Sequence, residues 1–192
     1  MPELPTTLRG TATSRRILDA AIEEFAERGI AGARIDRIIT AAQTNKAQLY
    51  SYFGSKEGLF DAAIADCLDR SASSVTFDAN DLAGWAVALY DESLRHPDLV
   101  RLMAWTRLER RPAGFIFTDF DPEPKLTAVA RAQAAGRLRP GEPSELLTLV
   151  AAMASAWSPA SSVYAATPDE PAADHERRRA LLRDCVQRAV AP

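Results

Sequence analysis

Apolar residues recur along this chain at the three- and four-residue spacing of amphipathic helices, and alternating strand patterns are nearly absent. The first such segment covers residues 14–28, with Ser14 as a cap and Gly29 as a stop. A second helix is expected over 34–42. A third begins near Asn45, a favoured N-cap residue, and Ser55 caps a longer fourth helix. The pattern predicts an all-α protein.

The C-terminal part continues the helical pattern between proline-containing breaks. An uncharged stretch from Leu146 to Pro168 is long enough for a membrane span, but Pro159 and many hydroxyl side chains interrupt it. We interpret this stretch as a helix buried in protein, so that no membrane partner is expected. Further helices are predicted over 81–95, 97–110, 123–137, 143–166 and 174–190.

Composition narrows the classes of function. The chain is 47% hydrophobic and 26% charged, with a net charge of −3, as in ordinary globular proteins. It has 2 cysteines and 2 histidines, too few and too scattered for a zinc site. We therefore expect no metal or cofactor, and we expect Cys67 and Cys185 to be buried packing residues. The N-terminus lacks the pattern of a signal peptide, which predicts a cytoplasmic protein.

The segment from 34 to 53 carries the most informative pattern. Two short predicted helices meet at residues 41–44, and the second begins with polar side chains before it turns apolar. This suits a helix-turn-helix, whose second helix places its N-terminal residues against base edges in the major groove. Amides can read bases, while cations and phenols reach phosphates. The candidate DNA-binding residues of this kind are Asn45, Lys46, Gln48, Tyr50, Tyr52 and Lys56.

The run from Ser14 to Phe60 also resembles a known family. RRILDAAIEEFAERG, then the helical pair, then LYSYFGSKEGLF are similar to the TetR family of bacterial transcriptional repressors, over residues 9–70. The resemblance implies a three-helix DNA-binding domain at 9–70, with its helix-turn-helix motif at 34–53. A long helix would join it to a ligand-binding and dimerisation bundle at 76–192.

The resemblance also implies roles for individual residues. The helix at 34–42 would position a recognition helix at 45–51. Tyr50 and Lys56 match positions that usually touch the DNA backbone. Lys46 and Gln48 match positions that face bases or phosphates, and Arg34 begins a helix that often meets a phosphate.

Two positions depart from the family pattern, and a third, Tyr52, has two possible roles. Gln43 stands where the turn usually has glycine, so it must tolerate the turn without glycine's conformational freedom. Gly58 replaces a good helix former, at an expected cost of about 0.5–1 kcal/mol. Tyr52 shares a face with Leu49 and Phe53, so it is either a core residue or a DNA contact.

The second half supplies candidates for a pocket and an interface, each weighed against simple core packing. A small-molecule pocket between helices needs apolar walls and a few polar groups, and a dimer interface could use small residues and an apolar stripe. The pocket candidates are Trp85, Leu89, Leu102, Met103, Trp105, Thr106, Phe115 and Trp157. The interface candidates are Ala151, Ala154, Ser155, Ser158, Leu182 and Val186.

Taken together, the sequence predicts a DNA-binding transcriptional regulator. The resemblance favours a repressor that binds a palindromic double-stranded operator as a homodimer and responds to an unknown small-molecule effector. An activator or a regulator without a ligand is the first alternative. A helical small-molecule-binding protein or enzyme is the second. Because no nucleophile–base pair, P-loop or catalytic carboxylate pair stands out, we expect no enzymatic activity.

Overall fold

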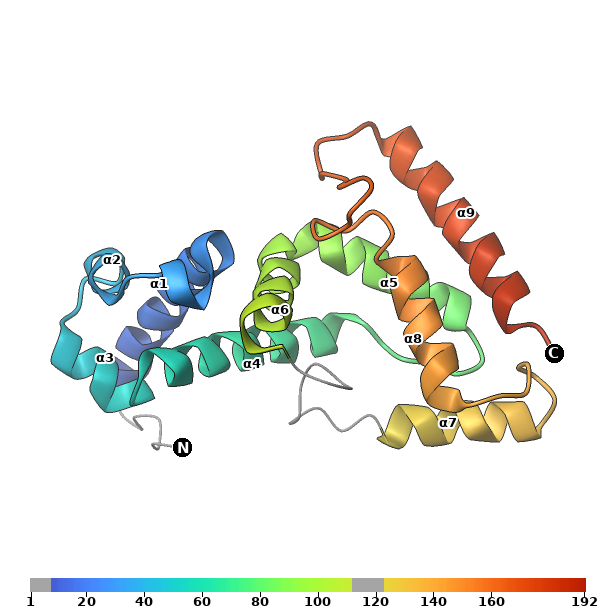
Figure 1. Ribbon diagram of the computed structural model, residues 1–192, viewed down its shortest axis with the longest axis horizontal. Helices are drawn as coiled ribbons and strands as arrows, with labels where there is room; N and C mark the ends of the chain where they lie inside the picture. Colours follow the sequence, from blue (N-terminus) through green and yellow to red (C-terminus); the bar gives the residue numbers. More distant parts are fainter. Residues whose placement is uncertain (1–7, 112–122) are drawn as a thin grey trace. The chain divides into compact units, whose positions relative to one another are not determined.

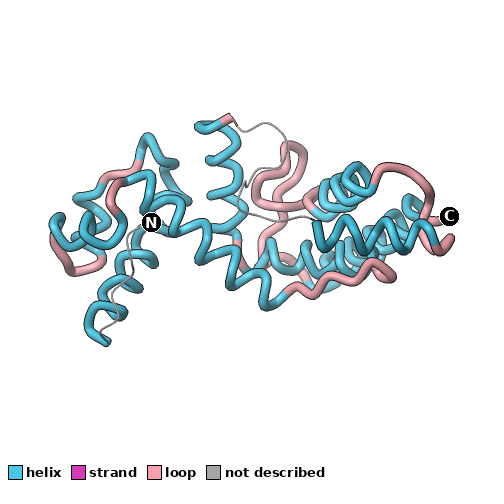
Figure 2. Tube along the Cα trace, turned by 90° about the horizontal axis from the view of Figure 1, so that it is seen from below, coloured by secondary structure: helices cyan, strands magenta, loops and turns pink. Residues whose placement is uncertain are grey.

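The computed structural model describes residues 8–111 and 123–192. Within these ranges every regular element is an α-helix, which confirms the predicted all-α class (Figures 1 and 2). The helices are α1 (Leu8–Gly32), α2 (Ile35–Ala41), α3 (Lys46–Phe53), α4 (Lys56–Ser74), α5 (Leu82–Arg95), α6 (Pro97–Arg110), α7 (Glu123–Ala134), α8 (Pro143–Ala154) and α9 (Ala172–Val190).

The predicted caps Asn45 and Ser55 are confirmed, but Ser14 is not a cap, because α1 already begins at Leu8 and Ser14 lies inside it. The predicted helix at 143–166 is too long. The Asn45 side chain accepts a hydrogen bond from the Gln48 amide at 2.9 Å, and the Ser55 hydroxyl accepts one from the Gly58 amide at 2.9 Å. The expected helix at 143–166 ends as α8 at Ala154, and turns and loop follow as far as residue 171. Proline at 159 disfavours helical geometry at the residue before it, so the uncharged stretch is only partly helical.

The described residues form two compact units. The first contains the residues up to Arg70 and those from Asp98 to Arg111, so α6 belongs to the same unit as α1–α3 and most of α4. The Phe25 and Phe60 rings meet edge to face in its core, with centroids 5.1 Å apart. Leu49 of α3 is fully buried there. Burial of this apolar face is what holds the short helices α2 and α3, because helices of this length are not stable alone.

Helix α1 changes direction at Gly29, where φ is +69°. A Cβ atom at this position would lie 2.2 Å from Glu109 Oε1 and 2.8 Å from a ring carbon of Trp105. The Trp105 indole and the Arg101 guanidinium both donate to the carbonyl of Ala26, at 3.2 and 2.7 Å. Glycine is therefore required both by the backbone conformation and by the close approach of α6.

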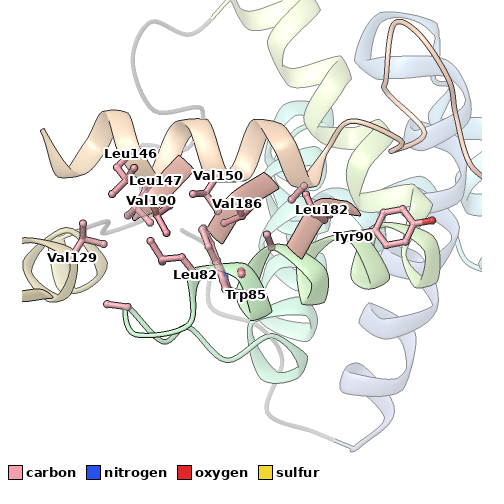
Figure 3. Close-up of a cluster of buried hydrophobic side chains, with 14 of the residues drawn as sticks. Leu82, Trp85, Tyr90, Val129, Leu146, Leu147, Val150, Leu182, Val186 and Val190 are labelled. Carbon is pink, nitrogen blue, oxygen red and sulfur yellow. The ribbon is translucent and has the colours of Figure 1, made fainter. Parts of the chain in front are cut away.

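The second unit contains α5, α7, α8 and α9. Its core is drawn in Figure 3, where α5, α7, α8 and α9 each contribute aliphatic side chains around Val150 and Val186, both fully buried. Cys185 lies next to this core on α9 but is exposed, so the expectation that it is buried was wrong. The neighbouring Val186 takes the inward position instead. Cys67, in the first unit, is buried as expected, and burial raises the pKa of its thiol.

Candidate nucleic-acid interface

A buried carboxylate on α1 holds the beginning of α2. Glu24 accepts a hydrogen bond from the backbone amide of Arg34 at 2.9 Å and from Nε of Arg37 at 2.8 Å. The Glu24 side chain is only 10% exposed. Hydrogen bonding to Arg37 lowers the pKa of Glu24, and the Arg34 amide acts in the same direction, so the group is ionised. Glu24 thus satisfies an otherwise unpaired helix N-terminal amide.

An arginine on α1 holds the other end of α2. Arg16 donates from Nε to the carbonyl of Ala42, the C-cap residue of α2, at 3.1 Å. Sequence reasoning missed both Arg16 and Glu24. The available signal was the position of Glu24, which lies seven residues after Ile17 and therefore on the apolar stripe of α1. A carboxylate on such a stripe needs a partner.

The turn between α2 and α3 places Gln43 in the left-handed region, with φ of +50°. Its amide bonds to the carbonyl of Thr40 at 3.2 Å, and the next amide, of Thr44, bonds to Ile39 at 3.0 Å. The turn thus keeps the backbone conformation that glycine adopts freely. The glutamine side chain makes it strained by about 1 kcal/mol.

Three polar side chains form a hydrogen-bonded ladder along α3. The Thr44 hydroxyl donates to Gln48 Oε1 at 2.7 Å, and Gln48 Nε2 donates to the Tyr52 hydroxyl oxygen at 3.1 Å. An amide has two acceptor lone pairs and two N–H donors. The ladder uses one of each, so Gln48 keeps one donor and one acceptor, the pair that recognises an adenine edge.

The other candidate contacts surround this ladder. Tyr50 is 40% exposed, and Arg34 is exposed at the start of α2. Lys46 pairs with Asp36 at 3.0 Å, and this hydrogen bond raises the pKa of the lysine. Both groups are more than half exposed, so the pair contributes little. A phosphate can therefore take over the ammonium group.

Three candidates have roles within the protein that limit their contact with DNA. The side chain of Asn45 is occupied as the cap of α3. Lys56 is half-buried as a residue, and its ammonium group lies 3.5 Å from the carbonyl of Ala31. Tyr52 is half-buried, with its ring edge to face against Phe53 and its hydroxyl on the ladder. The ring of Tyr52 therefore packs as a core residue would, while its hydroxyl lies on the polar ladder of α3.

The turn into α4 explains the second departure from the family pattern. A Cβ atom on Gly58 would lie 2.4 Å from the carbonyl oxygen of Phe53. That oxygen also accepts a hydrogen bond from the Ser55 amide at 2.8 Å. Gly58 is therefore more than a weak helix former, because the tight turn after α3 excludes any larger residue there.

The pocket candidates fall in both units. Trp85, Leu89 and Trp157 belong to the second unit. Phe115 lies outside the described residues. The remaining four lie on α6 in the first unit, and they are Leu102, Met103, Trp105 and Thr106. Of these, Leu102 and Thr106 are buried core residues.

The interface candidates mostly face the interior of the chain's own second unit. Ala151 is half-buried and Ser155 is exposed. Ala154, Leu182 and Val186 are buried in the core of the second unit. Ser158 is also buried, in the turns that follow α8. Across residues 8–111 and 123–192, no helix has the length and apolar character that a membrane crossing requires.

A helix-turn-helix whose first helix is fixed at both ends, and whose second presents a polar ladder, is the architecture of a DNA-binding protein. Comparison with protein families agrees. Residues 17–63 match the model of bacterial regulatory proteins of the tetR family. Residues 81–188 match a tetracyclin repressor-like C-terminal domain. The chain therefore belongs to the TetR family and is a DNA-binding transcriptional regulator.

Individual relatives support the assignment. The chain is 39% identical over 151 residues to the HTH-type transcriptional repressor SCO4008 of Streptomyces coelicolor, covering 77% of this chain and 78% of the relative. It is 31% identical over 105 residues to the repressor NicS of Pseudomonas putida, covering 51% and 50%. The crystal structure of the putative regulator SCO4942 from Streptomyces coelicolor aligns with a TM-score of 0.76 and 33% identity. That alignment covers 93% of this chain and 98% of the other.

Proposed function

We propose that this protein is a repressor that binds a palindromic operator as a homodimer in the cytoplasm and releases it when a small molecule binds the second unit. The Gln48 ladder carries the proposal, since it leaves one donor and one acceptor on a helix with exposed Lys46 and Tyr50 beside it. Gln48 would read a base. Phosphates would be contacted by Arg34, Lys46, Tyr50 and Lys56. For this contact, the Lys56 side chain must move away from the carbonyl of Ala31.

Exposed apolar side chains support a homodimer. Large exposed hydrophobic residues gather on α8, α9 and the loop between them, where Leu149 is 47% and Leu181 is 53% exposed. Such residues mark association surfaces when they occur together. Two recognition helices in one dimer would also read two half-sites about 34–36 Å apart.

The dimer surface can be tested with matched charge substitutions. Leu149→Glu and Leu181→Glu should each shift the protein toward monomer in light scattering after size-exclusion chromatography. Leu108→Glu is the control, since Leu108 is 66% exposed on α6 in the first unit. Dimers that persist in both α8 and α9 variants would contradict this surface.

The operator proposal is tested by selecting bound sequences from random DNA with the full chain. We expect an inverted repeat, with binding that weakens steeply as salt rises because phosphate contacts release counterions. In cells, a reporter behind the selected site should be repressed by the protein, whereas activation of that reporter would favour the alternative. A selected motif without two-fold symmetry would contradict binding as a symmetric dimer.

A further inference from the structure

A small group of buried polar side chains lies at one end of the second unit's core. Tyr90 of α5 is fully buried, and in Figure 3 its hydroxyl points away from the other labelled side chains. This oxygen lies 2.7 Å from Nδ1 of His175, a residue only 6% exposed on α9. Arg178 is three residues further along α9, so it shares a helix face with His175. Its side chain is 14% exposed.

Two nitrogen atoms of this group have no hydrogen-bond partner in the part of the chain that the structure describes. They are Nε2 of His175 and Nη1 of Arg178, and both are buried. Buried polar groups are nearly always paired, because an unpaired one has lost the hydrogen bonds that it made with water. A pair of such atoms on one face of a helix is therefore an indication of a ligand.

Both unpaired atoms are hydrogen-bond donors. A guanidinium nitrogen can only donate. For His175, we assign the Tyr90 hydroxyl as the donor to Nδ1, 2.7 Å away, because the Arg178 guanidinium donates toward the same Tyr90 oxygen and leaves the hydroxyl hydrogen for Nδ1. Nδ1 then accepts, and Nε2 carries the hydrogen in the neutral ring. Both donors come from the same face of α9, so any group that binds the two must be an acceptor.

The loop between α8 and α9 encloses these donors. Glu170 accepts a hydrogen bond from Nη2 of Arg178 at 2.5 Å, and the Tyr164 ring lies against the guanidinium, 5.0 Å from its carbon. Trp157 meets Tyr90 edge to face, with centroids 6.0 Å apart. Hydrogen bonding to Tyr90 and to Glu170 raises the pKa of Arg178, so the guanidinium is charged, while Nη1 has no well-aligned acceptor among the described residues. The surroundings combine aromatic walls with one charged and one neutral donor, which suits a small ligand with one polar end.

We propose that His175 Nε2 and Arg178 Nη1 bind the carboxylate group of a small organic acid in the second unit. A carboxylate has two oxygen atoms, so it can accept one hydrogen bond from each donor, and charge-assisted bonds of this kind are about twice as strong as neutral ones. The proposal rests on the proposed function only where it implies that the bound acid makes the protein release its operator. The binding itself requires no DNA.

The test uses formate, the smallest carboxylate, and the fact that the chain has 2 histidines. Histidine side-chain resonances of the ¹⁵N-labelled full chain are followed by NMR while sodium formate replaces sodium chloride at constant ionic strength. We expect a saturable shift of His175 Nε2. His96 is the internal reference, because its side chain is 45% exposed. Formamide, which offers a neutral oxygen, should bind at least about tenfold more weakly, or 1.4 kcal/mol.

Two variants complete the experiment. Arg178→Lys keeps the positive charge but removes the second nitrogen, so it should weaken formate binding about tenfold, again 1.4 kcal/mol. Arg177→Lys is the matched control on the exposed side of α9 and should bind like the parent. Circular dichroism and an unchanged His96 signal would show that each variant is folded.

Three results would overturn the proposal. They are a formate titration without saturation, equal binding of formate and formamide, and formate binding that Arg178→Lys leaves intact. The first of these would mean that the donors bind solvent water only. Operator binding by the same sample separates this failure from failure of the proposed DNA-binding function.

Discussion

The hydroxyl of Tyr52 is expected to contribute to operator recognition without touching DNA. In Tyr52→Phe, Gln48 Nε2 loses the acceptor that now lies 3.1 Å away, while the Tyr52 ring retains its packing against Phe53. The Gln48 amide stays anchored through Thr44 but can rotate more freely. Because only one orientation matches a base, this freedom lowers specific binding.

The size of the effect follows from one neutral hydrogen bond, about 0.5–1.5 kcal/mol. Specific affinity should fall about two- to twelvefold. Gln48→Ala removes the reading group itself and should cost about 1–3 kcal/mol at one base pair in each half-site. Affinity for unrelated DNA should stay nearly constant in both variants, because phosphate contacts determine it. The pair of substitutions therefore separates orientation of the amide from the amide itself.

Fluorescence anisotropy with the selected operator and with a scrambled duplex measures both quantities. Tyr50→Phe is the matched control, because Tyr50 is exposed and outside the ladder. If it contacts a phosphate, its loss weakens both duplexes alike. The reasoning is refuted if Tyr52→Phe weakens both duplexes equally, or if it leaves the preference for the operator unchanged.

Three further predictions concern stability, each measured by urea unfolding. Glu24→Gln should lower the free energy of unfolding by about 1.5–3 kcal/mol at pH 7. Because the folded pKa of Glu24 lies below its ordinary value of 4.5, its contribution is present above that pH and lost on further acidification, so the variant should lose less stability than the parent between pH 5 and pH 3. Gln43→Gly should raise the free energy of unfolding by about 0.5–1 kcal/mol, since it relieves the positive φ, and an unchanged midpoint would contradict strain in the turn. Gly58→Ala should cost about 1–3 kcal/mol through the collision with Phe53, whereas Gly32→Ala, whose Cβ meets its nearest neighbour at 3.4 Å, should be nearly neutral.

Local signals in the sequence predicted much of the fold. Helix α6 was predicted with the bounds Pro97–Arg110 that the structure has, because prolines and the change to polar residues mark its ends. The caps Asn45 and Ser55 act as their residue types suggest. The failure at α8 has a physical reason. The stretch after Ala154 is apolar enough for a buried helix, but turns at Ser155 and Ser158 divert it before Pro159.

The candidate site was predictable only in part, because sequence spacing does not show where a side chain finds its partner. Gln48 was predicted as a base reader from its amide. Its bonds to Thr44 and Tyr52 depend on the side-chain conformations that the folded helix selects, which spacing alone does not determine. The same holds for Glu24, whose partners come from α2.

The glycines show how tertiary contacts change the meaning of a local propensity. On propensity alone, Gly58 is a weakness in the first turn of α4. In the structure, Gly58 allows the turn after α3 to close against the Phe53 carbonyl. The helix propensity that glycine loses is therefore offset by a tight connection between α3 and α4. Gln43 is the opposite case, since it retains the glycine conformation without the glycine. Backbone hydrogen bonds and the Asn45 cap hold the strained turn before α3, and the turn after α3 has no room for a side chain at Gly58. The recognition helix is therefore fixed at both ends by local contacts.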